Sequence, residues 1–172
     1  MKTLQTSRIL GVDPGLRALG YGIIESTGRQ ARLVDYGVIE TSSKQPLHER
    51  LKTISQGMEQ VIETFHPDRM VFEKLLYCKN VSIALLLGQA RGAAIAAGAR
   101  LDLPMSEFSP TEIKSAVVGR GRASKLQVQK MVQLLLNLPS LPEPDHAADA
   151  LAAALTYVHS RPVHDLLQGV KR

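Results

Sequence analysis

The sequence predicts an α/β fold in which a mixed five-stranded sheet is flanked by helices. Three segments rich in branched apolar residues, 8–13, 20–26 and 31–41, follow one another with only short turn compositions between them. Such segments are typical of consecutive strands in an antiparallel meander. Beyond them, helical periodicity alternates with two short apolar segments, 70–74 and 104–108. These two segments should be parallel strands joined by crossover helices.

The helices are expected from apolar residues spaced three and four apart. The first begins at Leu47 and ends near Phe65, just before Pro67, which cannot continue it. A second helix, rich in small residues, is expected over 80–101. Side-chain caps mark the starts of the next two. The remaining expectations are a short helix capped by Thr111, a helix over 125–137 capped by Ser124, and a last helix within 142–158.

Length and composition predict a single domain. A chain of 172 residues that is 44% hydrophobic can form one core. We expect the domain over residues 1–160 and a mobile polar tail over 161–172. The single cysteine, Cys78, excludes an intrachain disulfide and suits a reducing, cytoplasmic location. No membrane span is expected, because polar residues interrupt the apolar segments.

The net charge of +5 and pI near 9.5 permit a polyanionic partner without requiring one. In open α/β sheets, ligands bind near the carboxyl ends of strands. Two acids are expected there: Asp13, directly before a Pro-Gly turn, and Glu73, within an apolar strand. Taken alone, Asp13 is equally well explained as a turn cap, and Glu73 as a solvent-facing residue at the strand edge.

The last predicted helix begins with three polar residues and is otherwise apolar. His146 and Asp149 are three apart, so they share one face near its N-terminus, whereas Asp145 is best explained as an N-cap. If this turn overhangs the edge that carries Asp13 and Glu73, three carboxylates and one imidazole converge. Like charges this close require bound cations or raised pKa values. A divalent metal site is therefore the economical interpretation.

Five segments together resemble the motifs of RuvC-type Holliday junction resolvases, in matching order and spacing over about residues 8–159. They are GVDPGLRALGYGII, FEKLLYCKN, LGQARGAAI, EFSPTEIKSAVVGRGRASKLQVQKMV and HAADALAAALTY. The resemblance implies a ribonuclease H-like fold and a homodimer that resolves four-way DNA junctions in recombination and repair. It implies paired symmetric nicks made with Mg²⁺ or Mn²⁺, leaving 5′-phosphate and 3′-hydroxyl ends. The implied protein partners are RuvA and RuvB.

The resemblance implies metal ligands at Asp13, Glu73 and Asp149, with two cations in each active site. Many relatives carry an acid three residues before the last ligand, where this chain has His146. We expect His146 to be a metal ligand or a proton-transfer group. Because Mg²⁺ prefers oxygen ligands, an imidazole at this position should favour Mn²⁺.

DNA contacts are implied at Lys114 and Lys125, which match two basic positions of the family; without the resemblance, both are better explained as solvated lysines on a helix surface. Arg120 and Arg122 add to a basic segment beside the acidic centre. Relatives commonly carry a base-stacking aromatic residue after the catalytic Glu. Here Leu76 aligns with that position, and Tyr77 is expected to replace it.

Other functions stay open on the residues alone. Actin-like kinases also begin with an acidic strand turn, but they need a longer chain. A DNA-binding module that has lost its metal site, and a nuclease acting on RNA or RNA–DNA hybrids, are both compatible with the composition. The small-residue helix could pack across a dimer seam or against its own sheet, and the sequence does not distinguish these.

Overall fold

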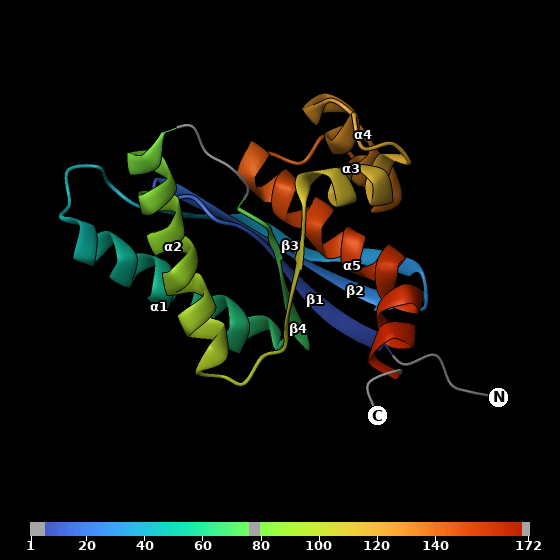
Figure 1. The fold of residues 1–172 in the computed structure, drawn as a ribbon, viewed down its shortest axis with the longest axis horizontal. Coiled ribbons are helices and arrows are strands. Elements are labelled where there is room, and N and C mark those ends of the chain that lie inside the picture. The colour runs from blue at the N-terminus through green and yellow to red at the C-terminus, as the bar shows by residue number, and fades with distance from the viewer. Residues whose placement is uncertain (1–5, 76–79, 170–172) are drawn as a thin grey trace.

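The structure, a computed structural model, describes the backbone of residues 6–75 and 80–169 and, within these ranges, side chains up to residue 160. Within these ranges, five strands and five helices follow in the order expected from the sequence, and Figure 1 shows their arrangement. The strands are β1 (Thr6–Asp13), β2 (Ala18–Thr27), β3 (Gln30–Glu40), β4 (Arg69–Glu73) and β5 (Met105–Phe108). The helices are α1 (Leu47–Phe65), α2 (Val81–Ala99), α3 (Pro110–Val118), α4 (Lys125–Leu135) and α5 (Asp145–Gly169).

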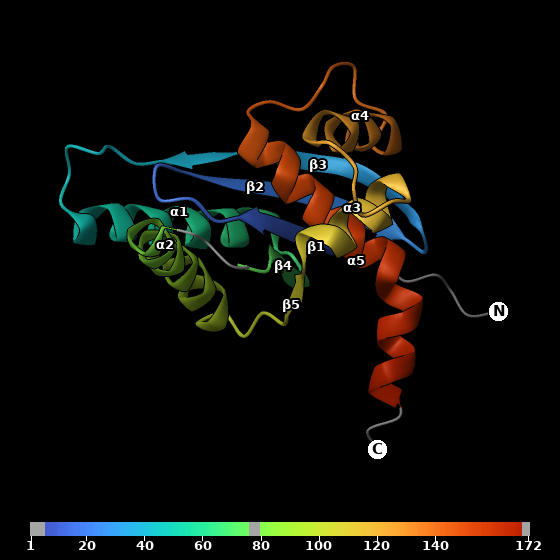
Figure 2. The ribbon, with the colours of Figure 1, turned by 45° about the horizontal axis from the view of Figure 1, so that its top comes forward.

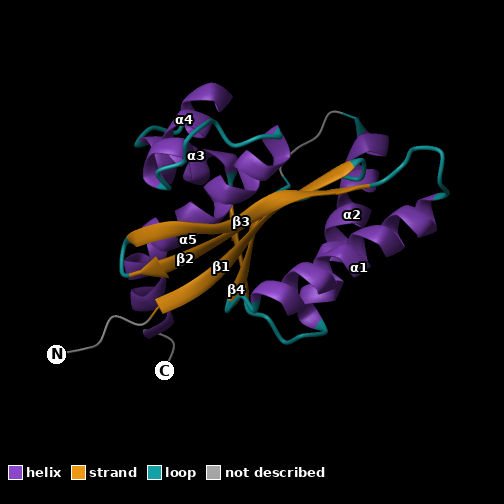
Figure 3. Ribbon diagram, turned by 180° about the vertical axis from the view of Figure 1, so that it is seen from behind, coloured by secondary structure: helices purple, strands orange, loops and turns teal. Residues whose placement is uncertain are grey.

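The sheet has the order β3-β2-β1-β4-β5, and Figure 3 labels the first four of these strands. The first three strands pair antiparallel, and β4 and β5 add to β1 in parallel. This arrangement confirms the predicted mixed sheet, a three-strand meander followed by two parallel strands. It also places β1 and β4 side by side with their carboxyl ends at the same edge.

Helices cover both faces of the sheet (Figure 2). Alternate residues of β1 divide the core: Ile9 faces a cluster built with α3, α4 and α5, whereas Leu10 and Val12 face a cluster built with α1 and α2. All three side chains are fully buried. Because side chains alternate along a strand, Asp13 follows Ile9 and Gly11 toward the α5 side.

Two glycines allow α5 to lie directly on the sheet. A Cβ on Gly20 would be 2.0 Å from the backbone oxygen of His146, and one on Gly11 would be 1.9 Å from that of Ala150. Any larger residue would force the helix away from β1 and β2. The close approach therefore sets the height of the first turns of α5 above the sheet.

The helix starts differ from the sequence-based expectations at two residues. Helix α3 is capped by Ser109, not Thr111: Ser109 Oγ accepts a hydrogen bond from the backbone N–H of Glu112, and the Glu112 carboxylate accepts one from that of Ser109. This reciprocal capping box, with Pro110 in the first turn, satisfies two free donors and leaves Thr111 inside the helix. Ser124 caps α4 as predicted, through a similar box with Gln127.

At the start of α5, the Pro144 carbonyl accepts hydrogen bonds from the N–H groups of Ala147 and Ala148. Asp145 lies in the first turn and its carboxylate contacts α4 instead, so the capping role expected for it is wrong. The helix continues through residue 160 to Gly169. The predicted boundary of a mobile tail thus falls inside a helix, and the mobility stays a prediction.

Helix α2 has one buried and one open face. Its buried residues are Ala90, Ala94, Ala97 and Gly98, so packing within its own fold occupies that side. The opposite stripe includes Val81 and Leu85, which are 70% and 63% exposed. Within the described residues, α2 alone is long and apolar enough to cross a membrane, a test that core helices of soluble proteins also pass. Arg91, paired with Glu107 on β5, interrupts its apolar sequence.

Candidate functional site

Asp13 and Glu73 stand at the carboxyl ends of two neighbouring parallel strands. The register pairs Val12 of β1 with Phe72 of β4, so the two acids follow directly at the same edge of the sheet. Glu73, like Val71, is on the α5 side of β4. The structure therefore brings the two acids expected at this edge into one neighbourhood.

His146 and Asp149 lie in the first turns of α5, above this edge. His146 Nδ1 is 2.6 Å from Asp13 Oδ2, a side-chain contact that joins the start of α5 to the end of β1. Hydrogen bonding to Asp13 raises the pKa of His146, although partial burial opposes the charged form. If Nδ1 donates to Asp13, the other ring nitrogen is left to accept a proton or bind a metal.

The carboxyl group of Glu73 is unusually basic for an acid. Burial, followed by repulsion from Asp13 and Asp149, raises the pKa of Glu73 to about 7. Burial also raises the pKa of Asp149, against a hydrogen bond from Lys125. Acids whose ionised forms are destabilised by burial and by one another form a site that a divalent cation would stabilise.

Lys125 is a positively charged side chain that contacts two acids at the start of α5. Its Nζ lies 3.0 Å from Asp149 Oδ2 and 3.3 Å from Asp145 Oδ2. Burial opposes its charged form, but hydrogen bonds to the two carboxylates raise the pKa of Lys125. Lys125 is the first residue of α4, so the capping box at Ser124 fixes its backbone beside α5.

A cavity of about 220 Å³ lies beside part of the site, and Asp13 and His146 do not line it. Its lining includes Glu73, Asp149, Lys114 and Lys125, so both lysines that the sequence singled out adjoin the acids. The positive charges of Lys114 and Lys125 lower the pKa of Glu73, but less than burial and the acids raise it. Arg120 and Arg122 lie in the exposed loop between α3 and α4 and do not line this cavity.

The donor set of Asp13, Glu73, His146 and Asp149 suits Mg²⁺ or Mn²⁺ by its chemistry: three carboxylates and one imidazole. In the described part of the chain, however, no three His, Cys, Asp or Glu side chains are grouped closely enough to hold one ion. Asp149 instead contacts Lys125, and Asp13 contacts His146. The ligand roles of these residues therefore stay predictions. Leu76 and Tyr77 lie outside the described residues.

Sequence reasoning missed the contribution of three residues to this site. Gln129 Nε2 donates a hydrogen bond of 2.8 Å to Asp145 Oδ1, and Asp145 in turn holds Lys125. Gly20 pairs with Asp13 across β1 and β2 and supports the backbone of His146. The sequence did contain a local sign that a helix packs closely at Gly20, because Gly22 follows two residues later in the same buried strand. The contact between Gln129 and Asp145 joins two helices, and no local sequence pattern indicated it.

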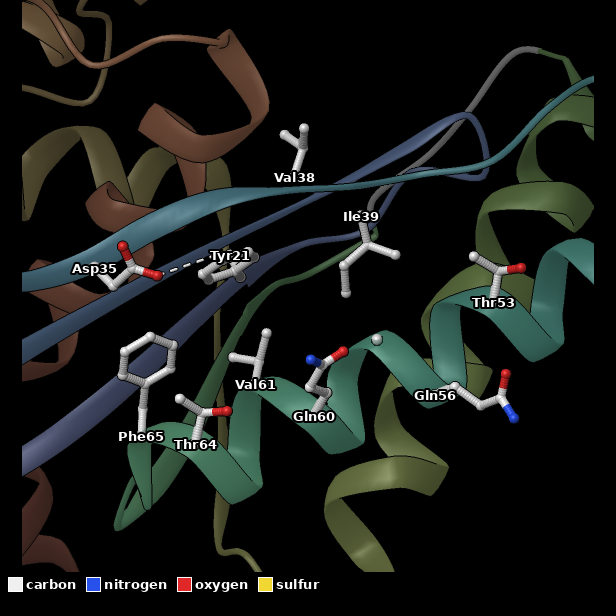
Figure 4. A pocket seen from close by; sticks show the side chains of 11 residues that line it. Tyr21, Asp35, Val38, Ile39, Thr53, Gln56, Gln60, Val61, Thr64 and Phe65 are labelled. Carbon is white, nitrogen blue, oxygen red and sulfur yellow. Dashed lines mark hydrogen bonds between the residues drawn. The ribbon is translucent and has the colours of Figure 1, made fainter.

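A second hollow, of about 570 Å³, lies between α1 and the strands β2 and β3 (Figure 4). Tyr21 Oη donates a hydrogen bond of 3.1 Å to Asp35 Oδ2 inside it. Burial, and then the charge of Asp35, raise the pKa of Tyr21. None of the candidate site residues lines this hollow, which is separate from the acidic edge.

Comparison with known families gives a match over residues 9–157 to the family model "Crossover junction endodeoxyribonuclease RuvC". The protein of that name from Syntrophotalea carbinolica is 48% identical over 160 residues, covering 93% of this chain and 99% of the relative. The one from Shewanella pealeana is 53% identical over 153 residues, covering 88% of this chain and 87% of the relative.

Solved structures give the same result. The chain matches Thermus thermophilus RuvC with a TM-score of 0.84 at 33% identity, over 91% of this chain and 96% of that one. It matches the same protein in complex with a Holliday junction substrate with a TM-score of 0.88 at 33% identity, over 92% and 96% of the two chains. The yeast mitochondrial Holliday junction resolvase, 14% identical with a TM-score of 0.64, shares the fold.

Proposed function

Because the chain belongs to the RuvC family of crossover junction endodeoxyribonucleases, we propose that it resolves four-way DNA junctions by paired symmetric nicks. One observation supports this function above the rest: acids from β1, β4 and α5 meet at one edge of the sheet beside two lysines. A kinase-type domain would not require this arrangement. A binding module without catalysis would not need half-buried acids that repel one another.

We propose that Asp13, Glu73 and Asp149 hold a divalent cation, Mg²⁺ or Mn²⁺, that each site takes two, and that His146 is either a further ligand or a proton-transfer group. When bound, such a cation supplies a lowered pKa for a coordinated water and neutralises charge on the phosphate. The raised pKa values of Glu73 and Asp149 support this proposal, because a cation would relieve the repulsion that causes them.

The residues of the chain then divide the remaining tasks. His146, held by Asp13 through Nδ1, has one ring nitrogen left, and this nitrogen either binds the cation, in which case the proton of the attacking water passes to solvent, or accepts that proton itself. The water oxygen bonds to phosphorus and the bond from phosphorus to the 3′ oxygen breaks. The departing oxygen takes up a proton, leaving 5′-phosphate and 3′-hydroxyl ends.

Lys114 and Lys125 are proposed to contact the phosphate group beside the acids, and the support is that both line the cavity that Glu73 and Asp149 also line. Arg120 and Arg122, exposed on the loop between α3 and α4, are proposed to contact the backbone further from the cut. Stacking on an unpaired base is proposed for Tyr77, with Leu76 in the position where relatives carry an aromatic residue.

We propose a homodimer that joins through α2. Val81, Leu85, Gly88 and Gly92 follow one another at spacings of three and four, so they form one stripe. The stripe lies opposite the buried face. Nothing lies within 4 Å of where a Cβ would stand on Gly88 or Gly92, so a second helix could approach closely there. A twofold dimer would present two active sites to two strands of like polarity.

A cytoplasmic location and an association with RuvA and RuvB are proposed from family membership alone. The location suits an enzyme whose substrate is DNA.

The test is cleavage of an end-labelled mobile four-way junction beside linear duplex and an RNA–DNA hybrid of the same sequence, in Mn²⁺ and in Mg²⁺. Paired nicks in the junction alone, abolished by Asp13→Asn, are expected. Tight junction binding without cutting in either metal would identify a binding module, and preferential cutting of the hybrid would identify a different nuclease.

A further inference from the structure

Asp145 has no task in the proposed function, yet both oxygens of its carboxylate are engaged. Oδ1 accepts a hydrogen bond of 2.8 Å from Gln129 Nε2, and Oδ2 lies 3.3 Å from Lys125 Nζ. Gln129 follows Lys125 by four residues on α4, so both side chains lie on one face of that helix. Asp145 therefore contacts two successive turns of α4 from the first turn of α5.

Lys125 is shared between two carboxylates of the same helix. Asp145 and Asp149 are four residues apart on α5, and the ammonium of Lys125 lies within 3.3 Å and 3.0 Å of them. An ammonium group has three donors and can hold both acceptors at once. The two acids are not equivalent, because the side chain of Asp145 is 62% exposed and that of Asp149 is 26% exposed.

This sharing matters because, in the proposed function, Lys125 and a divalent cation compete for the Asp149 carboxylate. Lys125 already holds the carboxylate that a divalent cation would need. A lysine paired with Asp149 alone would either resist the cation or, once displaced, extend into solvent on its flexible stem. A second acceptor that already contacts the same ammonium avoids both outcomes.

We propose that Asp145, oriented by Gln129, is a positioning residue that retains Lys125 beside the active site when the Asp149 carboxylate turns to a divalent cation. The inference rests on the proposed function, since it assumes that Asp149 is a metal ligand. Asp145 itself touches neither the substrate nor the cation in this proposal. It acts by holding the Lys125 ammonium beside the active site, where the lysine can contact the phosphate.

Stability measurements cannot test this role, because exposed ion pairs contribute little to folding. The test is Mn²⁺ titration by calorimetry, without DNA, on wild type, Asp145→Asn, Lys125→Met and the double variant. Asp145→Asn should weaken Mn²⁺ binding roughly fivefold when Lys125 is present and less than about twofold in the Lys125→Met background. Glu143→Gln, which removes one exposed negative charge from the loop just before α5, should leave the affinity unchanged.

An equal loss in both backgrounds would overturn the proposal, because Asp145 would then act only through its charge.

A second measurement is junction cleavage by Gln129→Leu, which keeps both acids. It should lower kcat roughly threefold at unchanged KM, with no further loss when combined with Asp145→Asn. An unchanged kcat would equally overturn the role given to Gln129.

Failure of the proposed function has a different signature in the same titrations. If Asp13→Asn and Asp149→Asn leave the Mn²⁺ isotherm unchanged, the acids are not metal ligands and the function itself is wrong. If those variants abolish binding while Asp145→Asn has the same effect in both backgrounds, the metal site stands and the positioning role alone fails.

Discussion

His146 Nδ1 lies 2.6 Å from Asp13 Oδ2, so an imidazole from α5 and a carboxylate from β1 form one hydrogen-bonded pair across the candidate site. The pair joins the last helix of the fold to its first strand, 133 residues apart in sequence. It also gives His146 a fixed ring orientation, which a general base or a metal ligand needs.

The metal preference of cleavage should depend on His146. Replacing it by Asp supplies an oxygen donor, which Mg²⁺ prefers to nitrogen. We expect His146→Asp to raise the ratio of Mg²⁺- to Mn²⁺-supported junction cleavage by about tenfold. His146→Ala should lose most activity in both metals. Equal activity of wild type in the two metals across a concentration series would remove the basis for this preference.

The pair should also affect stability at neutral pH. Because the pKa of His146 is raised, the folded chain keeps its proton at pH values where the unfolded chain has lost it. The stabilisation is complete below the ordinary histidine pKa of about 6.5. It disappears as the pH rises through the higher pKa that His146 has in the folded chain. Urea unfolding without metal should show this decline above about pH 6.5 in wild type, and a smaller decline in Asp13→Asn.

Glu73 should produce a separate pH dependence at lower pH. Its pKa is raised from 4.5 to about 7, so between these values the folded chain binds a proton that the unfolded chain has released. The free energy of unfolding should therefore fall as pH rises through this window. Glu73→Gln, which mimics the protonated acid, should remove the fall and stabilise the metal-free protein by about 1 kcal/mol at pH 8, a figure reduced for solvent screening.

The measurement is urea unfolding of both proteins in chelator at pH 4.5, 6 and 8. Adding Mn²⁺ should reverse the order at pH 8, because a bound cation stabilises the ionised acid of the wild type. A wild-type stability that stays constant or rises between pH 4.5 and 7 would show that the repulsion around Glu73 is already relieved.

The fold was predictable because periodicity depends on local sequence. Strand β1 is a segment rich in branched apolar residues followed by a turn composition, and α1 keeps its apolar residues on one face, so both were recognised from local sequence. Thr111 was mistaken for the cap of α3 because Ser109 and Glu112 form a capping box two residues earlier, a pattern of S-x-x-E that the sequence did contain.

The acids of the site were predictable for a different reason. Asp13, Glu73 and Asp149 are polar residues in apolar segments, which mark strand ends and a helix start at one edge. The partners of Asp145 were not predictable, because its contacts with Lys125 and Gln129 depend on how α4 packs beside α5. A carboxylate after a proline has the same local sequence whether it caps a helix or binds a neighbouring one.

Gly20 should be as important for metal binding as the ligands themselves. A Cβ there would stand 2.0 Å from the backbone oxygen of His146, so Gly20→Ala must move the first turn of α5. We expect a loss of about 1–3 kcal/mol in stability and a strongly weakened Mn²⁺ isotherm. Gly22→Ala is the matched comparison, since its closest neighbours are side-chain atoms of Leu151. It should destabilise the fold while leaving Mn²⁺ binding closer to wild type.

The effect of adding bulk to the exposed stripe of α2 should distinguish a closely packed dimer interface from a loose apolar one. If two copies of α2 approach closely at Gly88 and Gly92, Gly92→Leu adds bulk where the backbones need to meet and should dissociate the dimer. If the stripe is only a loose apolar patch, the added leucine should strengthen association. Sedimentation velocity over a concentration series distinguishes these outcomes.

Leu85→Glu provides the second arm of this experiment. A charge at this exposed position should dissociate either kind of interface, because an unpaired carboxylate would be buried between the copies. The resulting monomer should still bind Mn²⁺, since α2 contributes no candidate ligand. It should nick one strand of a junction without the matching second cut, because coordinated nicking needs two sites on one twofold axis. A Leu85→Glu protein that stays dimeric and cuts in pairs would place the dimer interface elsewhere on the molecule.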